Sequence, residues 1–155
     1  MEQQERGSGP AGRIETLDRD ACLALLSTVV VGRIAWSAST NDLKIVPVNF
    51  VLDGDSIVFK TARGGKLDAV RHGVPLTFEA DDVEPALHVG WSVVLNGRAE
   101  VVTERGQVRR LERFVGAAWA PMAEPVFVRL SPHEISGRRI PLHAGGVTTQ
   151  PVDDA

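Results

Sequence analysis

The sequence predicts a mainly β, α+β fold: a split β-barrel of six strands with a few short helices. Two observations support this prediction. Short segments rich in β-branched and aromatic residues recur along the chain, and tight turns or short loops join most of them. The 155 residues, 43% of them hydrophobic and 24% charged, have the ordinary composition of one globular domain. A formal net charge of -3 gives no bulk attraction for nucleic acid or for an anionic membrane.

Turn signals separate the predicted strands. Seven extended segments, which would supply the six or so strands of the barrel, are expected over residues 30–37, 43–52, 56–62, 75–80, 90–104, 126–130 and 135–140. Asp53-Gly54 predicts a tight hairpin, and Gly97 predicts a bulge of the kind that a closing barrel needs. Pro47 cannot donate a ladder hydrogen bond, so its backbone should face an edge, a bulge or a ligand.

Three short helices complete the expected set. Asp18 is suited to cap the first, in which apolar residues recur at helical spacing. The second is expected over residues 66–71 and the third over residues 108–118. Residues 14–142 should form one domain, with flexible polar tails over residues 1–13 and 143–155.

The composition also favours a cytoplasmic protein without a metal. Cys22 is the single cysteine, so no intramolecular disulfide can form. No apolar run approaches the ~18 residues of a membrane span, and the polar N-terminus lacks the apolar stretch of a secretory signal. The four histidines have no metal-ligand spacing; His72, His88, His133 and His143 are expected to be surface or packing residues, and Trp36 a core residue.

Residues 59–67, FKTARGGKL, carry the clearest chemical pattern. They end a strand, pass through two glycines and open a helix with Lys66 in its first turn. Glycine lets the backbone approach a ligand, and a helix N-terminus favours an anion. Lys60 and Arg63 add positive charge, and Thr61 adds a hydroxyl donor. From these residues alone, a phosphate site and an ordinary solvated turn are equally open, while a Walker loop is excluded because leucine follows Lys66.

Several motifs, taken in order and spacing, resemble the pyridoxamine 5'-phosphate oxidase-like family of FMN-binding split barrels. They are VGRIAW, IVPVNFVLDGDSIVFKTARGGKL, LTFEADD, GWSVVLNGRAEVV, a tryptophan before a proline at residues 119–121, and VRLSPHEISGRRI. Each is weak alone, but together they cover nearly the whole ordered chain and are specific for the family. The resemblance implies an FMN-binding homodimer with the cofactor near the interface.

The resemblance also implies which residues contact the cofactor. Backbone groups beside the isoalloxazine ring would come from Val46, Pro47, Val48 and Asn49. The ribityl chain and phosphate would be held by Phe59, Lys60, Thr61 and Ala62, with Lys66 as the main phosphate cation. Across the dimer interface, a partner would bring Trp91 and Ser92 near the cofactor.

The C-terminal region departs from the vitamin-converting members of the family. In those members, Arg and His residues bind the phosphate and the ring of the substrate. Here Ser136-Gly137 replaces the expected aromatic-glycine stretch, and the spacing of Arg139 and His143 does not match. The resemblance therefore implies an FMN-dependent oxidoreductase that acts on a small organic substrate other than pyridoxamine phosphate. It identifies no catalytic residue.

Two alternatives remain open at this stage. One is a deazaflavin-dependent reductase, whose long cofactor tail would lie along a basic groove formed by Arg63, Arg98 and Arg138. The other is a non-catalytic flavin- or haem-binding protein of the same fold. The pattern of residues does not separate these two from an FMN enzyme.

Overall fold

The computed structural model describes residues 13–115 and 121–142, which contain seven strands and three α-helices. In chain order the elements are β1 (Glu15–Leu17), α1 (Arg19–Leu26), β2 (Val31–Ser39), β3 (Asp42–Asp53), β4 (Ser56–Thr61), α2 (Gly65–Arg71), β5 (Leu76–Glu84), the 3-10 helix η1 (Pro85–Leu87), β6 (Val89–Val101), α3 (Arg105–Val115) and β7 (Val126–Ile140). Within these described ranges, no helix is long and apolar enough to span a bilayer.

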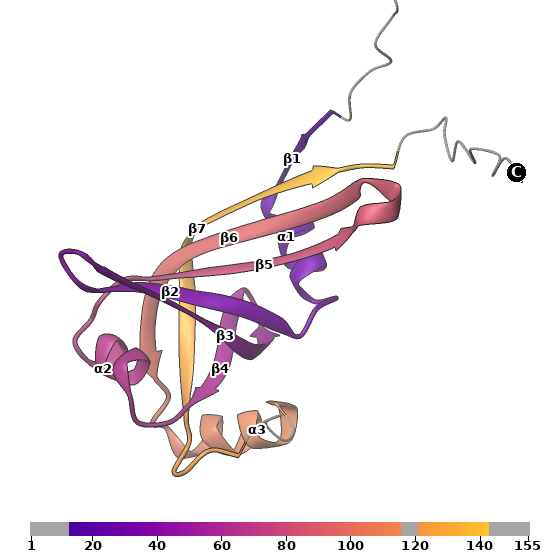
Figure 1. The fold of residues 1–155 in the computed structure, drawn as a ribbon. Coiled ribbons are helices and arrows are strands. Elements are labelled where there is room, and N and C mark those ends of the chain that lie inside the picture. Colours follow the sequence, from indigo (N-terminus) through magenta and orange to yellow (C-terminus); the bar gives the residue numbers. More distant parts are fainter. Residues whose placement is uncertain (1–12, 116–120, 143–155) are drawn as a thin grey trace, which may run out of the picture.

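Antiparallel ladders join six of the strands into a ring. In the order β7–β4–β3–β2–β5–β6 each strand pairs with the next, and β6 pairs again with β7. The β5–β6 hairpin and the end of β7 project from this ring as an arm, and β1 lies along β7 there (Figure 1). The predicted mainly β fold with six barrel strands is confirmed.

Two turn predictions are also confirmed. Asp53 pairs with Ser56 across the β3–β4 hairpin, and Gly54 has a φ of +65°, a conformation that glycine adopts without strain. The ladder between β6 and β7 shifts register at Gly97. A Cβ atom at that position would overlap the backbone oxygen of Ser131, so the bulge needs a residue without a side chain.

The structure corrects several predicted boundaries. β1 was not predicted, because three residues are too few to show a periodicity. The strands expected over 126–130 and 135–140 form the single strand β7, and the strand expected over 90–104 ends at Val101. α1 begins as predicted, with the Asp18 carboxylate accepting a hydrogen bond from the Ala21 N–H at 2.8 Å. The last residues of the predicted third helix lie outside the described ranges.

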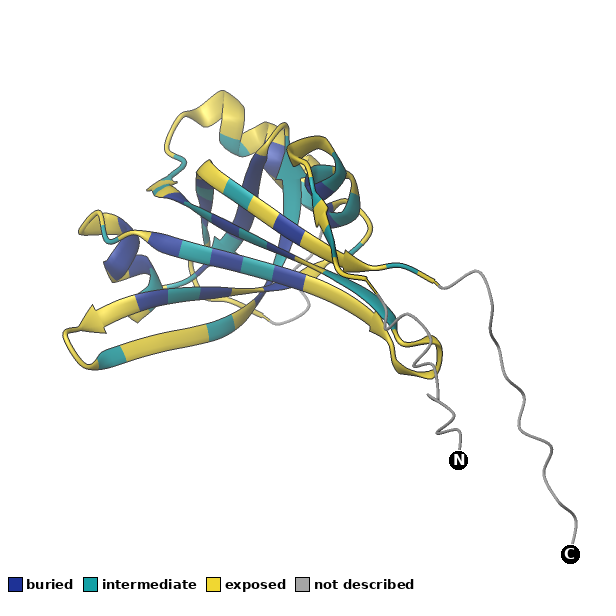
Figure 2. Ribbon diagram, turned by 90° about the horizontal axis from the view of Figure 1, so that it is seen from above, coloured by how far each residue is buried: buried dark blue, intermediate teal, exposed yellow. Residues whose placement is uncertain are grey.

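The hydrophobic core fills the ring. Along the strands, buried residues alternate with more exposed ones (Figure 2), as expected when one face of each strand points inward. Phe50 and Phe78 meet edge to face, with ring centroids 4.7 Å apart. A smaller cluster of Val58, Leu111 and Phe127 holds α3 against the outside of β4 and β7.

Candidate functional site

A cleft of about 820 Å³ opens where β3 and β4 separate. The two strands pair only from Phe50 and Phe59 to the hairpin turn. Beyond that point β3 follows β2, whereas β4 follows β7. α2 borders the space between them, and the volume suits a cofactor or a small ligand. The lining residues are Trp36, Ser37, Ala38, Lys44, Val46, Thr61, Ala62, Arg63, Gly64, Gly65, Lys66, Asp68, Ala69, His72, Val74 and Met122.

One edge of β3 faces this opening. Over residues 42–49 the described ladders pair β3 with β2 only, and Pro47 lies opposite Arg33 in that ladder. The expectation that Pro47 occupies an edge is therefore confirmed. Backbone groups that point away from β2 are available to a ligand at this edge, because no second strand receives their hydrogen bonds.

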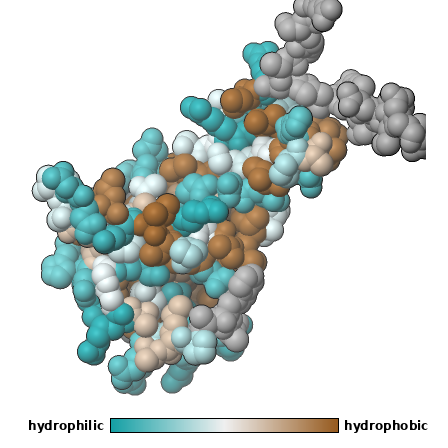
Figure 3. Space-filling view, in the orientation of Figure 1, coloured by the Kyte–Doolittle hydropathy of each residue, from teal (hydrophilic) through white to brown (hydrophobic). Residues whose placement is uncertain are grey.

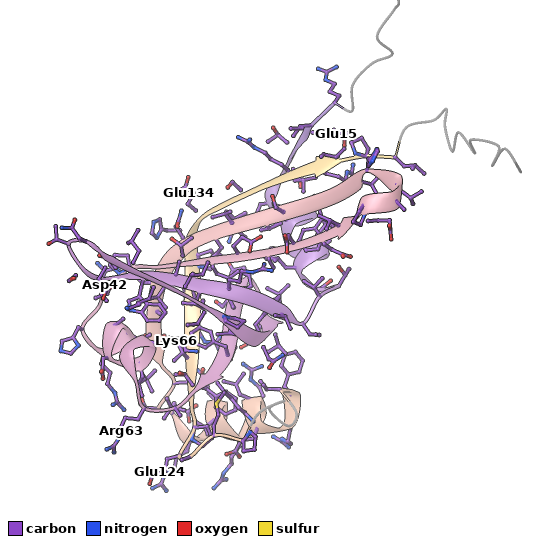
Figure 4. All side chains as sticks on the ribbon, viewed as in Figure 1. Glu15, Asp42, Arg63, Lys66, Glu124 and Glu134 are labelled. Atoms are coloured by element: carbon purple, nitrogen blue, oxygen red, sulfur yellow. The ribbon has the colours of Figure 1, made fainter. Side chains whose placement is uncertain are left out.

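Lys66 is the half-buried cation of the cleft. Its Nζ lies 5.7 Å from the centroid of the Phe59 ring, and burial lowers the pKa of the Lys66 ammonium group below its usual range. No carboxylate in the described part of the chain pairs with this ammonium group. Figure 4 shows Lys66 between α2 and the strands, with Arg63 at the outer corner of the β4–α2 loop. An anion bound here would compensate the cost of burying the ammonium charge.

The loop between β4 and α2 leaves room for such an anion. Gly64 has a φ of +152°, and no atom lies within 4 Å of the position that a Cβ would take there. Gly64 is also the N-cap residue of α2, so no side chain caps the first N–H groups of the helix. Gly65 and Lys66 carry two of these N–H groups, and both residues line the cleft.

The charged side chains of the cleft favour an anionic ligand. Lys44, Arg63 and Lys66 carry positive charge there, against one carboxylate, that of Asp68. Asp42 pairs with Lys44 at 2.9 Å, but both side chains are about half exposed, and solvent weakens such a pair. The local excess of positive charge contrasts with the net charge of -3 of the whole chain.

The structure brings four of the sequence-predicted cofactor residues into the cleft: Val46, Thr61, Ala62 and Lys66. Val48 and Phe59 are buried in the core and do not line the cleft. Pro47 and Asn49 lie on β3 beside the cleft. The Lys60 side chain lies on the opposite face of β4, with its Nζ 5.3 Å from the Phe127 ring centroid. The cofactor contacts themselves remain a prediction.

Trp91 and Ser92 lie in the projecting arm and not in the cleft. Because they are consecutive residues of β6, their side chains point to opposite faces of the sheet. Trp91 packs against the hydrophobic core, whereas Ser92 is exposed. A flavin lying on either face would meet the side chain of only one of them. Their contact with a partner's cofactor remains a prediction.

Sequence reasoning missed several residues of the cleft. Trp36 is a core residue, as predicted, with 8% of its surface exposed, but it also lines the cleft together with Lys44. Trp36 and Lys44 are opposite one another in the β2–β3 ladder, so strand pairing could have placed them together. His72 lines the cleft as well, and nothing in its local sequence indicated this. His143 lies outside the described residues.

Comparisons with known proteins agree with this architecture. The family model for pyridoxamine 5'-phosphate oxidase matches residues 18–139. An uncharacterised protein of Mycobacterium tuberculosis is 34% identical over 135 residues, which are 84% of this chain and 88% of the relative. A crystal structure from Corynebacterium glutamicum, provisionally named a pyridoxamine 5'-phosphate oxidase, has a TM-score of 0.73 at 29% identity, covering 88% of this chain and 100% of the other.

A flavin-binding protein is also among the similar structures. The FAD-binding protein of Mycobacterium smegmatis has a TM-score of 0.70 at 32% identity, covering 83% of this chain and 100% of that protein. The match to the family model spans every described element from α1 to α3 and nearly all of β7. The chain belongs to the pyridoxamine 5'-phosphate oxidase family.

Proposed function

We propose that the protein is a cytoplasmic, FMN-dependent oxidoreductase that acts on a small organic substrate other than pyridoxamine phosphate. The observation that carries the proposal is the cationic cleft around the half-buried Lys66, which pairs with no carboxylate among residues 13–115 and 121–142. A phosphate monoester would supply the negative charge that this ammonium group lacks among the described residues. The similarity to an FAD-binding protein at 32% identity supports a flavin as the ligand.

The residues of the cleft fit the separate parts of FMN. Thr61, Arg63 and Lys66 would bind the phosphate. Trp36, Val46, Val74 and Met122 offer apolar surface to a ring system. The edge of β3 at residues 46–49 would offer backbone groups to the polar rim of the isoalloxazine. When bound, a flavin supplies hydride or electron transfer, while the protein orients it and excludes other chemistry.

FAD is the second candidate cofactor, because a structurally similar protein with 32% identity is an FAD-binding protein. The cleft extends from Lys66 to Lys44 and His72, so it has room for more than the one phosphate group of FMN. A deazaflavin or haem would make the chain a reductase of another type or a non-catalytic binder. Flavins, deazaflavins and haem have different absorbance spectra, so one spectrum separates these three classes. FMN and FAD share the same chromophore, and chromatography of the released ligand separates them.

The test is to identify the ligand of the purified chain and to measure its affinity. Absorbance and chromatography of the released ligand identify it, and calorimetry with FMN, FAD and riboflavin follows. We expect FMN to bind ~10- to 100-fold more tightly than riboflavin, the effect of at least one charge-assisted hydrogen bond. Equal affinity for FMN and riboflavin would refute the phosphate site. A haem spectrum would refute the flavin assignment.

We also propose a homodimer that brings Trp91 and Ser92 of one chain near the cofactor of the other. Leu43 and Ile45 on the outer face of β3 are 80% and 65% exposed, and Pro47 continues the strip. Figure 3 shows hydrophobic groups among hydrophilic ones over the β2–β3 region. An apolar strip on an otherwise polar sheet face is typical of a surface that a partner covers.

A further inference from the structure

His72 carries an imidazole into the cleft from the C-terminal end of α2. It is the C-cap residue of that helix, and its Nδ1 lies 2.7 Å from the backbone oxygen of Asp68. His88 and His133, the other histidines of the described residues, do not line the cleft. Among the described residues, His72 is therefore the one imidazole that a ligand in the cleft could meet.

The contact with Asp68 determines which ring nitrogen carries the proton. A carbonyl oxygen can only accept a hydrogen bond, so Nδ1 must be the donor. In the neutral ring the lone pair then lies on Nε2. Because Nδ1 donates its hydrogen bond to the Asp68 carbonyl, Nε2 is the nitrogen that can bind a ligand or accept a proton from solvent.

The charges that share the cleft with His72 come from α2, β3 and the β4–α2 loop. Asp68 and the carbonyl groups at the end of α2 are the negative groups. Lys66, Arg63 and Lys44, the last of which pairs with Asp42, are the opposing cations. β2 lines the cleft with uncharged residues, and no β6 residue reaches it. An anionic ligand would neutralise the opposing cations and add a favourable charge, so its binding shifts the balance toward the protonated ring.

We infer that His72 is the proton-exchanging residue of the cleft, and that its Nε2 takes up a proton from solvent when the anionic cofactor binds. The inference rests on the proposed function, because it needs an anionic flavin in the cleft. By linkage, a ligand that draws a proton onto Nε2 is itself bound more tightly at lower pH.

The protonated ring also fits one class of substrate. In the reduction of a C=O or C=N group, the π bond would break, the carbon would receive the hydride that a reduced flavin supplies, and the oxygen or nitrogen would receive a proton. His72 Nε2–H would supply that proton and return to its neutral form. Compounds with a carbonyl or imine group are thus the substrate class that this residue favours.

The experiment measures proton uptake when FMN binds. Calorimetric titrations at pH 7 in two buffers of different ionisation enthalpy give the number of protons taken up for each FMN. We expect the wild-type chain to take up more than His72→Gln, whose side-chain amide can still donate to the Asp68 carbonyl. His133→Gln, outside the cleft, is the matched control and should behave as the wild type. Any proton change on the FMN phosphate itself is common to all three chains and cancels.

Equal proton uptake by the wild type and His72→Gln, with FMN bound to both, would overturn the inference. The binding heat is recorded separately, so a chain that binds no FMN contradicts the proposed function instead. Nitrogen NMR of the ligand-free chain provides a second test that needs no cofactor. We expect the Nδ1–H tautomer at His72, and finding the proton on Nε2 would also overturn the inference.

Discussion

Arg129 Nη2 donates a hydrogen bond to Asp53 Oδ2 at 2.6 Å and so joins β7 to the end of β3. Arg110 of α3 donates to the same carboxylate, with its Nη1 3.0 Å from Asp53 Oδ1. The hydrogen bond from Arg110 is the main cause that lowers the pKa of Asp53 to about 2, and Arg129 adds to it, although burial opposes the change. One carboxylate therefore fixes α3 to the closed end of the barrel.

Asp53→Asn should destabilise the protein at neutral pH. The folded-state pKa lies below the usual value of 3.8, so the stabilisation is complete above pH 5 and is lost as the pH falls toward 2. The lowering of the Asp53 pKa corresponds to roughly 2 kcal/mol in the free energy of unfolding. Urea unfolding measured from pH 7 to pH 2.5 should show that the free energies of unfolding of the wild type and the variant become similar at the lowest pH.

Asp55→Asn is the control for this ion pair. Asp55 pairs with Arg19 at 2.7 Å, but both side chains are about half exposed, so solvent screens the interaction and little stability should be lost. If the wild type and Asp53→Asn differed by the same free energy of unfolding at every pH, the ion pair would not be the cause of the difference.

Lys66→Gln should weaken the binding of FMN by ~10-fold or more and leave riboflavin binding nearly unchanged. The reason is that the ammonium group would contact the phosphate, which riboflavin lacks. Arg71→Gln removes the same charge from the other end of α2, outside the cleft, and serves as the matched control. Calorimetry with both ligands measures the effect. A parallel loss for both ligands would mean that Lys66 supports the fold and not the phosphate.

Gly97→Ala should destabilise the fold by ~2 kcal/mol or more, because the new methyl group would overlap the backbone at Ser131. Gly65→Ala is the control: the nearest atom to its added Cβ is a Trp36 carbon at 3.8 Å, an ordinary contact. Thermal unfolding of the two variants measures the difference. Equal melting temperatures would show that the bulge between β6 and β7 can relax around a side chain.

Ile45→Asp should shift the protein toward the monomer if the outer face of β3 is the dimer interface. Phe114→Asp changes another exposed apolar residue, 55% exposed on α3, and should leave the oligomeric state unchanged. Light scattering during gel filtration gives the mass of each variant. A wild-type mass of 16.7 kDa, that of one chain, would contradict the dimer itself.

The sequence allowed the barrel to be predicted because its signals are local. The Asp53-Gly54 turn and the bulge at Gly97 each depend on the backbone preference of glycine, and both are where they were expected. Lys66 was expected at the phosphate site because it follows two glycines at a strand-to-helix junction and because the family resemblance implied this role. The side chain of Lys60 could also have been placed correctly, since the period of two along β4 separates it from Thr61.

Other parts of the site depend on contacts between distant segments. His72 reaches the cleft because α2 packs beside β2, and no local pattern encodes that contact. β1 forms because β7 offers an edge far along the chain, as in the pairing of Thr16 with Arg138, 122 residues later. Such features follow from tertiary packing and could not be predicted from neighbouring residues.

The separation of β3 from β4 has a consequence for hydrogen exchange. Amide protons of residues 42–49 that point away from β2 have no ladder partner, so they should exchange rapidly in the ligand-free chain. A bound cofactor would accept some of these hydrogen bonds and slow their exchange. The amide protons of Val51 and Asp53, which point to β4 in the hairpin ladder, would hardly change. The exchange pattern of β3 would thus map the ligand along the strand without any substitution.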